Sequence, residues 1–266
     1  MKKLNLFDSH CHLDDPSFEP DFQEVVHRAA TAGVHRMLVV GIDRPTSERA
    51  VALAKTNTGM YASVGVHPHD ASACSDEVLA HLRSLASTPE VVAWGEIGLD
   101  FYRMYTPQKD QEQCFMRQLE IAGALNLPHI FHERDSRGRL LELLKAVPNN
   151  RRSAVVHCFS GTEDELGRYL DMGFYIGITG IVTINGRGKS LRRMIPSIPA
   201  DRLLIETDSP YLTPAPRRNK FRRNEPAFVR EVLLKIAEVR REDPSALAQQ
   251  VWSNSCRLFR LDPSAS

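Results

Sequence analysis

The chain has 266 residues, of which 42% are hydrophobic and 25% are charged, an ordinary composition for a globular protein with a large core. The formal net charge is +1, so any attraction for a polyanion must come from a local cluster of charges. The sequence has no apolar signal segment, no run long enough to cross a membrane, and five scattered cysteines without a C-x-x-C pair, so we expect a reduced, cytoplasmic protein without a membrane anchor or a zinc–thiolate cluster.

Short apolar stretches rich in Val, Ile or Phe alternate with longer amphipathic stretches along the chain. The expected strands are residues 5–8, 36–41, 61–66, 91–96, 128–132, 154–157, 175–179 and 202–206. The expected helices are residues 22–32, 45–56, 76–87, 106–125, 136–147, 163–172, 189–195, and a final region, 226–259, interrupted near Pro244. This alternation predicts an α/β fold, a (β/α)₈ TIM barrel formed by residues 1–266 as a single domain. An open doubly wound sheet is the alternative, but no G-x-G-x-x-G turn follows the first strand.

Two histidines lie at the end of the first expected strand, in the segment LFDSHCHLD at residues 6–14. Side chains alternate along a strand, so His10 and His12 share a face and Cys11 lies on the other. Two neighbouring imidazoles offer half of a metal site, although such pairs also occur by chance on protein surfaces.

Imidazoles and carboxylates also follow later strands, and the chemistry of a TIM barrel lies at the C-terminal ends of its strands. Each such residue has a structural alternative: a packed histidine, a paired buried carboxylate, or a turn residue. Taken together they form a set that suits two divalent ions with a bridging carboxylate and open positions for water and substrate. The set is His10, His12, Glu96, His132, His157 and Asp208.

The sequence resembles the TatD family of metal-dependent hydrolases and deoxyribonucleases, within the amidohydrolase superfamily. The resemblance rests on LFDSHCHLD, GVHP (65–68), GEIGLDFYR (95–103), HERD (132–135), HCFSG (157–161), ETDSPYL (206–212), RRNEP (222–226) and NSCRLF (254–259). It implies a TIM barrel in which His10, His12 and Asp208 hold one metal ion, His132 and His157 hold a second, and Glu96 bridges them. The chain departs from the family pattern at residues 132–136 and in the extra basic residues near 214–226, which concern the substrate groove.

Two such ions would lower the pKa of a bound water, and the hydroxide would attack a phosphorus or carbonyl centre. We expect Glu96 and Asp208 to be catalytic. Asp208 either passes the water's proton to the leaving oxygen or serves only as a ligand. The identity of the metal is open, because the histidines suit zinc, manganese, cobalt or nickel whereas the resemblance implies magnesium or manganese.

A basic segment follows the last expected strand, with Phe221 inside it, and contains Arg217, Arg218, Lys220, Arg222 and Arg223. Cations attract phosphates and an aromatic ring can stack on a base, although many charged runs are only solvated surfaces. We expect Arg217, Arg218, Arg222, Arg223 and His67 to bind substrate; orienting a metal ligand is the alternative for His67. Tyr102, Arg103 and Arg134 are weaker candidates for which loop packing is the alternative, and His69 is expected at the surface.

We therefore predict a metal-dependent hydrolase, a TatD-type exonuclease that cleaves phosphodiester bonds in DNA, in a single strand or from an end. One alternative is a carbonyl hydrolase of amides, esters or lactones, or a hydrolase of small phosphate esters, on the same two-metal site. A binding module with a structural metal is a further alternative. The sequence leaves the oligomeric state open.

Overall fold

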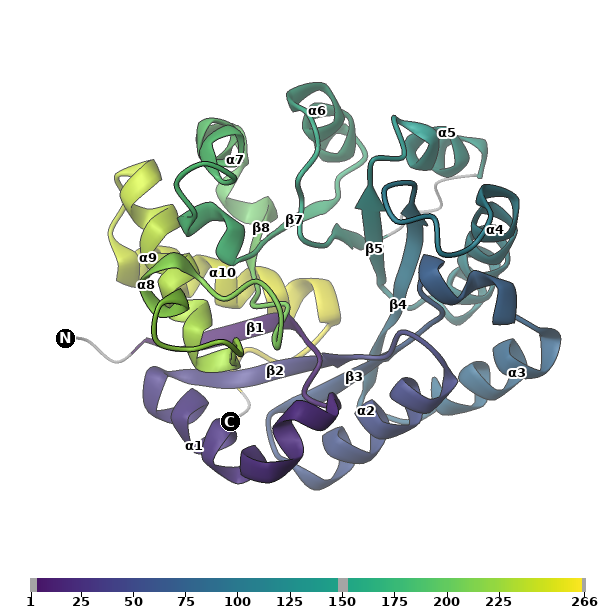
Figure 1. Cartoon of the computed structure of the whole chain (residues 1–266), viewed down its shortest axis with the longest axis horizontal. Helices are drawn as coiled ribbons and strands as arrows, with labels where there is room; N and C mark the ends of the chain where they lie inside the picture. The colour runs from purple at the N-terminus through teal and green to yellow at the C-terminus, as the bar shows by residue number, and fades with distance from the viewer. Residues whose placement is uncertain (1–3, 148–152, 265–266) are drawn as a thin grey trace. The chain divides into compact units, whose positions relative to one another are not determined.

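The computed structural model describes residues 4–147 and 153–264 (Figure 1). Contacts between Cα atoms divide the chain into two compact units, Met1–Val39 with Ile176–Ser266, and Val40–Tyr175. We call them the first and the second unit. No helix among the described residues is both long and apolar enough to cross a membrane.

Within residues 4–147 and 153–264, eight strands form one sheet in the order β1-β2-β3-β4-β5-β6-β7-β8. The strands are β1 (Leu6–Cys11), β2 (Val34–Val40), β3 (Met60–Val64), β4 (Val91–Asp100), β5 (His129–Arg134), β6 (Ala154–Val156), β7 (Tyr175–Ile178) and β8 (Leu203–Ile205). The helices are α1 (Phe22–Ala32), α2 (Arg44–Thr56), α3 (Asp76–Leu85), α4 (Gln108–Leu125), α5 (Arg139–Ala146), α6 (Glu163–Asp171), α7 (Lys189–Met194), α8 (Ala215–Arg218), α9 (Val229–Arg240) and α10 (Pro244–Phe259). A strand order that follows the chain, with intervening helices, is the order predicted for a (β/α)₈ barrel.

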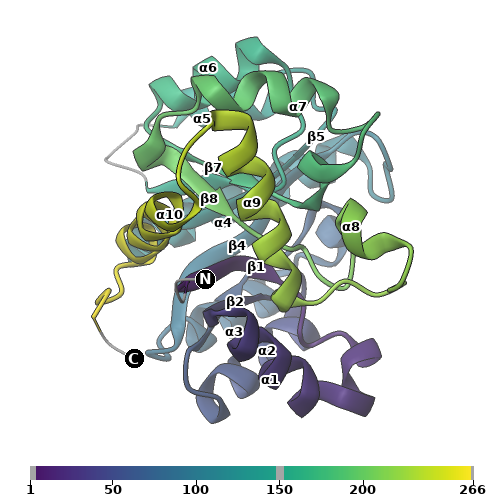
Figure 2. The same cartoon turned by 90° about the vertical axis from the view of Figure 1, so that its left-hand side faces the viewer.

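In the first unit, β1 pairs in parallel with β2, and β7 pairs with β8. Helix α10 contacts β1 and β8, as Figure 2 also shows. Phe7 of β1 packs its ring 5.8 Å from that of Phe259 and 6.3 Å from that of Trp252, both on α10. Asp243 caps α10 by accepting hydrogen bonds from two backbone N–H groups, so the predicted interruption near Pro244 is a true helix start.

In the second unit, β3, β4, β5 and β6 pair in parallel (Figure 1). Helix α2 contacts β3, and helix α4 contacts β4. The predicted end of the fourth strand at residue 96 is wrong, because pairing with β5 continues to Asp100 after a register shift between Trp94 and Ile97. Glu96 therefore lies inside β4. His132 likewise lies inside β5, two residues before its end.

The close approach of β4 and β5 explains the glycines of the GEIG segment. A Cβ atom at Gly95 would lie 2.6 Å from Ile130, and one at Gly98 would lie 1.9 Å from the carbonyl oxygen of His132. Both glycines also have positive φ angles, 154° and 152°, which other residues rarely adopt. Glycine at both positions lets β5 approach β4 on either side of Glu96.

Candidate active site

The backbone holds His10, His12 and Asp208 next to one another in the first unit. His10 lies in β1, His12 follows that strand directly, and Asp208 comes shortly after β8. The N–H of Asp208 donates to the carbonyl of His10 (2.9 Å), and the N–H of His12 donates to the carbonyl of Ser209 (2.7 Å). These two bonds align the segment after β8 with the end of β1.

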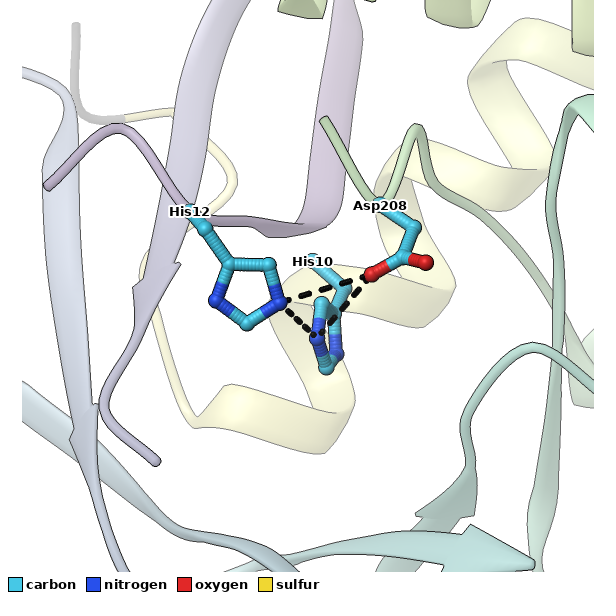
Figure 3. A group of neighbouring side chains, drawn as sticks. All are labelled: His10, His12 and Asp208. Carbon is cyan, nitrogen blue, oxygen red and sulfur yellow. Dashed lines mark hydrogen bonds and ion pairs between the residues drawn. The ribbon is translucent and has the colours of Figure 1, made fainter. Parts of the chain in front are cut away.

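The three side chains point toward one another (Figure 3). The Nε2 atoms of His10 and His12 lie 3.3 Å apart, and Asp208 Oδ1 lies 3.8 Å and 3.4 Å from them, respectively. Ligands of one tetrahedral ion, each bonded at about 2.0–2.1 Å, are separated by about 3.3 Å. The atom types and their spacing therefore fit a divalent cation.

The buried side chain of Asp8 also links β1 to the segment after β8. Its buried carboxyl group accepts hydrogen bonds from the backbone N–H of Thr207 (2.8 Å) and from the Thr207 hydroxyl (2.5 Å). Burial raises the pKa of Asp8 to about 8, although both hydrogen bonds from Thr207 act in the opposite direction.

A second cluster lies in the second unit, around Glu96. Glu96 Oε1 lies 2.6 Å from His132 Nδ1, 3.7 Å from His67 Nε2 and 3.8 Å from His157 Nε2. Burial lowers the pKa of His132, but hydrogen bonds to Asp100 and Glu96 outweigh it and raise that pKa to about 9. The carboxylate and imidazole groups gathered here are ligand types that suit a divalent ion.

His67 has a hydrogen bond that decides which of its nitrogens carries a proton. The backbone N–H of His69 donates to His67 Nδ1 (3.0 Å), so neutral His67 carries its proton on Nε2. Burial and the nearby His132 hold the pKa of His67 well below its usual range, so the ring is neutral at pH 7. A protonated Nε2 has no lone pair for a metal. Neutral His67 is therefore a hydrogen-bond donor at Nε2, which lies 3.2 Å from His132 Nδ1. Its contact to substrate stays a prediction.

Asp100 is a buried residue of this site that the sequence analysis missed. Its Oδ2 accepts from His69 Nε2 (2.8 Å) and His132 Nε2 (3.3 Å), and its Oδ1 accepts from the N–H groups of Tyr102 (3.0 Å) and Arg103 (2.8 Å). Burial raises the pKa of Asp100, but the hydrogen bonds from His132 and His69 outweigh it and hold that pKa below its usual range. Asp100 thus leaves His132 Nδ1 directed at Glu96.

The expectation of a surface His69 is only partly right, because this half-buried ring contacts Asp100. The sequence did contain a signal for Asp100: Glu96, Gly98 and Asp100 are alternate residues, and alternate residues of a strand share a face.

The predicted basic residues have different surroundings. Arg217 pairs with Glu231 (2.8 Å), and Arg223 pairs with Asp21 (2.7 Å) and donates to the carbonyl of Ser17. By contrast, Arg218 and Arg222 are exposed and form no ion pair within the described part of the chain. Substrate binding by all four arginines stays a prediction, and the structure gives Arg217 and Arg223 internal partners as well.

A model of the family described as TatD related DNase matches residues 7–260. A protein from Cronobacter sakazakii named 3'-5' ssDNA/RNA exonuclease TatD is 45% identical over 257 residues, covering 96% of this chain and 97% of that protein. Among solved structures, a TatD homolog from Escherichia coli is 33% identical with a TM-score of 0.89, covering 97% of this chain and 98% of that one. A TatD family hydrolase from Entamoeba histolytica is 25% identical with a TM-score of 0.87, covering 97% and 99%.

These matches extend over nearly the whole chain. The solved relatives and the strand order confirm the predicted (β/α)₈ barrel. The matches also confirm the predicted enzyme class, a TatD-type deoxyribonuclease that is a metal-dependent hydrolase. The imidazole and carboxylate clusters supply ligand types suited to divalent metal. The chain belongs to the TatD related DNase family.

Proposed function

We propose that this protein is a 3'-5' exonuclease that shortens single-stranded DNA with the help of two divalent metal ions. The observation that carries the proposal is the cluster of His10, His12 and Asp208, whose ligand atoms lie 3.3–3.8 Å apart. The polarity and the single-stranded substrate follow the name of the Cronobacter relative, which is similar over 96% of this chain.

Each cluster would hold one ion. His10, His12 and Asp208 supply two nitrogens and a carboxylate to the first ion, and Glu96, His132 and His157 supply the same types of ligand to the second. A further bond from Glu96 to the first ion stays a prediction from the family resemblance. When bound, such ions lower the pKa of a water molecule and withdraw charge from a phosphate oxygen.

The protein's own groups would then have distinct tasks. The carboxylate of Asp208 accepts a proton from the attacking water and returns it to the leaving oxygen. Neutral His67 donates a hydrogen bond from its Nε2–H group to a phosphate oxygen and keeps its proton. Arg218 and Arg222 attract the phosphates of the strand through their exposed charges.

The test is digestion of single-stranded DNA labelled at its 5' end, with magnesium, manganese or zinc added to chelator-treated protein. A ladder of shortened, labelled strands is expected, because removal from the 3' end leaves the label in place. Release of the labelled nucleotide as the first product would contradict the polarity. Intact DNA with every metal would contradict the substrate and would direct the search to amides, lactones and small phosphate esters.

Two variants test the site. Asp208→Asn should lower turnover by a factor of about 100 or more, the size of effect common for a lost general base, and Asp171→Asn serves as its matched control on an exposed residue. Metal analysis should find two ions per wild-type chain and one per chain of the double variant His10→Ala, His12→Ala. Two ions in that variant would refute the assignment of the first cluster.

A further inference from the structure

The loop after β4 carries an unusual group of exposed aromatic and cationic side chains in the second unit. Tyr102 and Tyr105 are 62% and 63% exposed, values that are high for such large rings. Arg103 lies between them in the sequence, and Arg134 ends the neighbouring strand β5. We call Tyr102, Arg103, Tyr105 and Arg134 the tyrosine–arginine surface.

The side chains of this surface are arranged in pairs. The guanidinium carbon of Arg134 lies 4.1 Å from the centre of the Tyr102 ring, close enough for a cation–π contact. Arg103 Nη1 donates to the Tyr105 hydroxyl (2.8 Å). Neither arginine forms an ion pair with an acidic residue in the described part of the chain. Their positive charges are therefore available to an anionic ligand.

Buried side chains form hydrogen bonds with the backbone of this loop. Asp100 Oδ1 accepts from the N–H groups of Tyr102 and Arg103. The buried Gln111 amide donates to the carbonyls of Asp100 (3.1 Å) and Thr106 (3.0 Å), and the Thr106 hydroxyl donates to the carbonyl of Pro68 (2.6 Å). These bonds hold the backbone that carries the two rings, so ordering the loop costs a ligand little entropy. Arg134 lies over Tyr102 and Arg103 over Tyr105, and the rest of each ring is open to a base.

The same carboxylate connects this surface to the cluster around Glu96. Asp100 Oδ2 accepts from His69 and His132, and the His69 ring lies 4.7 Å from the Tyr105 ring. Tyr102 and Met104 also line an open hollow of about 730 Å³, together with Gln108, Ser136, Arg137 and Arg139, and with the acidic Asp135. Its size is within the range of small-molecule sites.

We propose that the tyrosine–arginine surface binds a single strand of nucleic acid, with unpaired bases stacked on Tyr102 and Tyr105 and phosphates held by Arg103 and Arg134. This inference rests on the proposed nuclease function and assigns part of its substrate selectivity to four residues. Stacking on a ring needs a base whose face is open, which a duplex does not offer. The surface thereby favours unpaired strands over duplexes of the same charge.

Binding without turnover is the direct test. A fluorescent oligothymidylate is titrated into chelator-treated protein, and its anisotropy gives the Kd. Base stacking contributes about 1–3 kcal/mol per base, so the double variant Tyr102→Ala, Tyr105→Ala, which removes two stacks, should weaken binding at least about 30-fold. The matched double variant with Phe at both positions keeps the rings and should bind within about twofold of wild type. Replacing Arg103 and Arg134 by Gln should reduce the slope of log Kd against log salt by about 0.7 per lost phosphate contact.

Turnover separates this inference from the proposed function. The Ala double variant should show a raised KM for single-stranded DNA, with unchanged hydrolysis of methyl p-nitrophenyl phosphate, which has no base. If the wild type shortens DNA and the Ala variant binds and cleaves it equally well, the surface is only loop packing and the inference is overturned. If the wild type hydrolyses the small ester but neither binds nor shortens DNA, the proposed substrate itself is wrong. Thermal melting of each variant shows whether unfolding causes a loss of binding. The single variant Tyr102→Ala is a milder change that serves the same purpose.

Discussion

The substitution Asp100→Asn tests how the second cluster is oriented. Asp100 accepts four hydrogen bonds, two from backbone N–H groups of the loop and two from the rings of His69 and His132. An asparagine has one acceptor oxygen and one NH₂ group. The backbone donors cannot change, so the oxygen should face the loop and the NH₂ group should face the two histidines.

The consequence falls on His132. The NH₂ group of the asparagine would face His132 Nε2, so this nitrogen must accept a hydrogen bond. The neutral His132 ring then carries its proton on Nδ1, the nitrogen directed at Glu96. That nitrogen can no longer bind a metal. Loss of such an orienting carboxylate typically lowers metal affinity by about 10–100-fold, which corresponds to about 1.4–2.7 kcal/mol.

Calorimetric titration of manganese into chelator-treated protein measures this effect. One of the two metal sites should weaken in Asp100→Asn while the other keeps its affinity, and nuclease activity should recover partly at high metal concentration. The isosteric change Asp171→Asn removes an exposed carboxylate and is the control. Wild-type affinity at both sites in Asp100→Asn would refute the orienting role of Asp100.

Three further measurements test the structure. The free energy of unfolding is measured by urea titration with a chelator present. As the pH rises from about 4 to about 8, it should fall less in Asp8→Asn than in the wild type. The folded protein holds a proton on Asp8 up to a pKa of about 8, whereas the unfolded chain releases it near 3.8, so ionisation disfavours folding in that window; parallel pH profiles would contradict the raised pKa. Gly98→Ala should cost about 2 kcal/mol or more of unfolding free energy, because its Cβ would lie 1.9 Å from a backbone oxygen. Gly167→Ala, with open space around its Cβ in a helix, should be neutral or stabilising by about 0.5–1 kcal/mol, and equal effects of the two changes would contradict the close approach of β4 and β5. Replacing Arg218 and Arg222 by Ala should weaken DNA binding mainly at low salt, and an unchanged salt dependence would exclude both from phosphate contact.

Local sequence patterns predicted the order of the elements closely. The predicted helix 22–32 coincides with α1, since its apolar spacing and the glycine after it mark one buried face and a stop. The sequence also grouped His10, His12 and Asp208 as candidate ligands, because a strand end is visible locally and the family resemblance linked the distant segments. The structure brings these three side chains together, and their role as ligands stays a prediction.

The partners of those residues depended on tertiary structure. Asp100 lies 31 residues from His69 and 32 residues from His132, and the three meet only through the folding of the chain. The register shift in β4 that places Glu96 inside the strand depends on the pairing with β5. Likewise, Glu231 and Asp21 decide that Arg217 and Arg223 have internal partners, whereas Arg218 and Arg222 do not. Periodicity and turn residues are determined by neighbours along the chain, whereas the partner of a buried charge is set by the register and packing of segments that are remote in sequence.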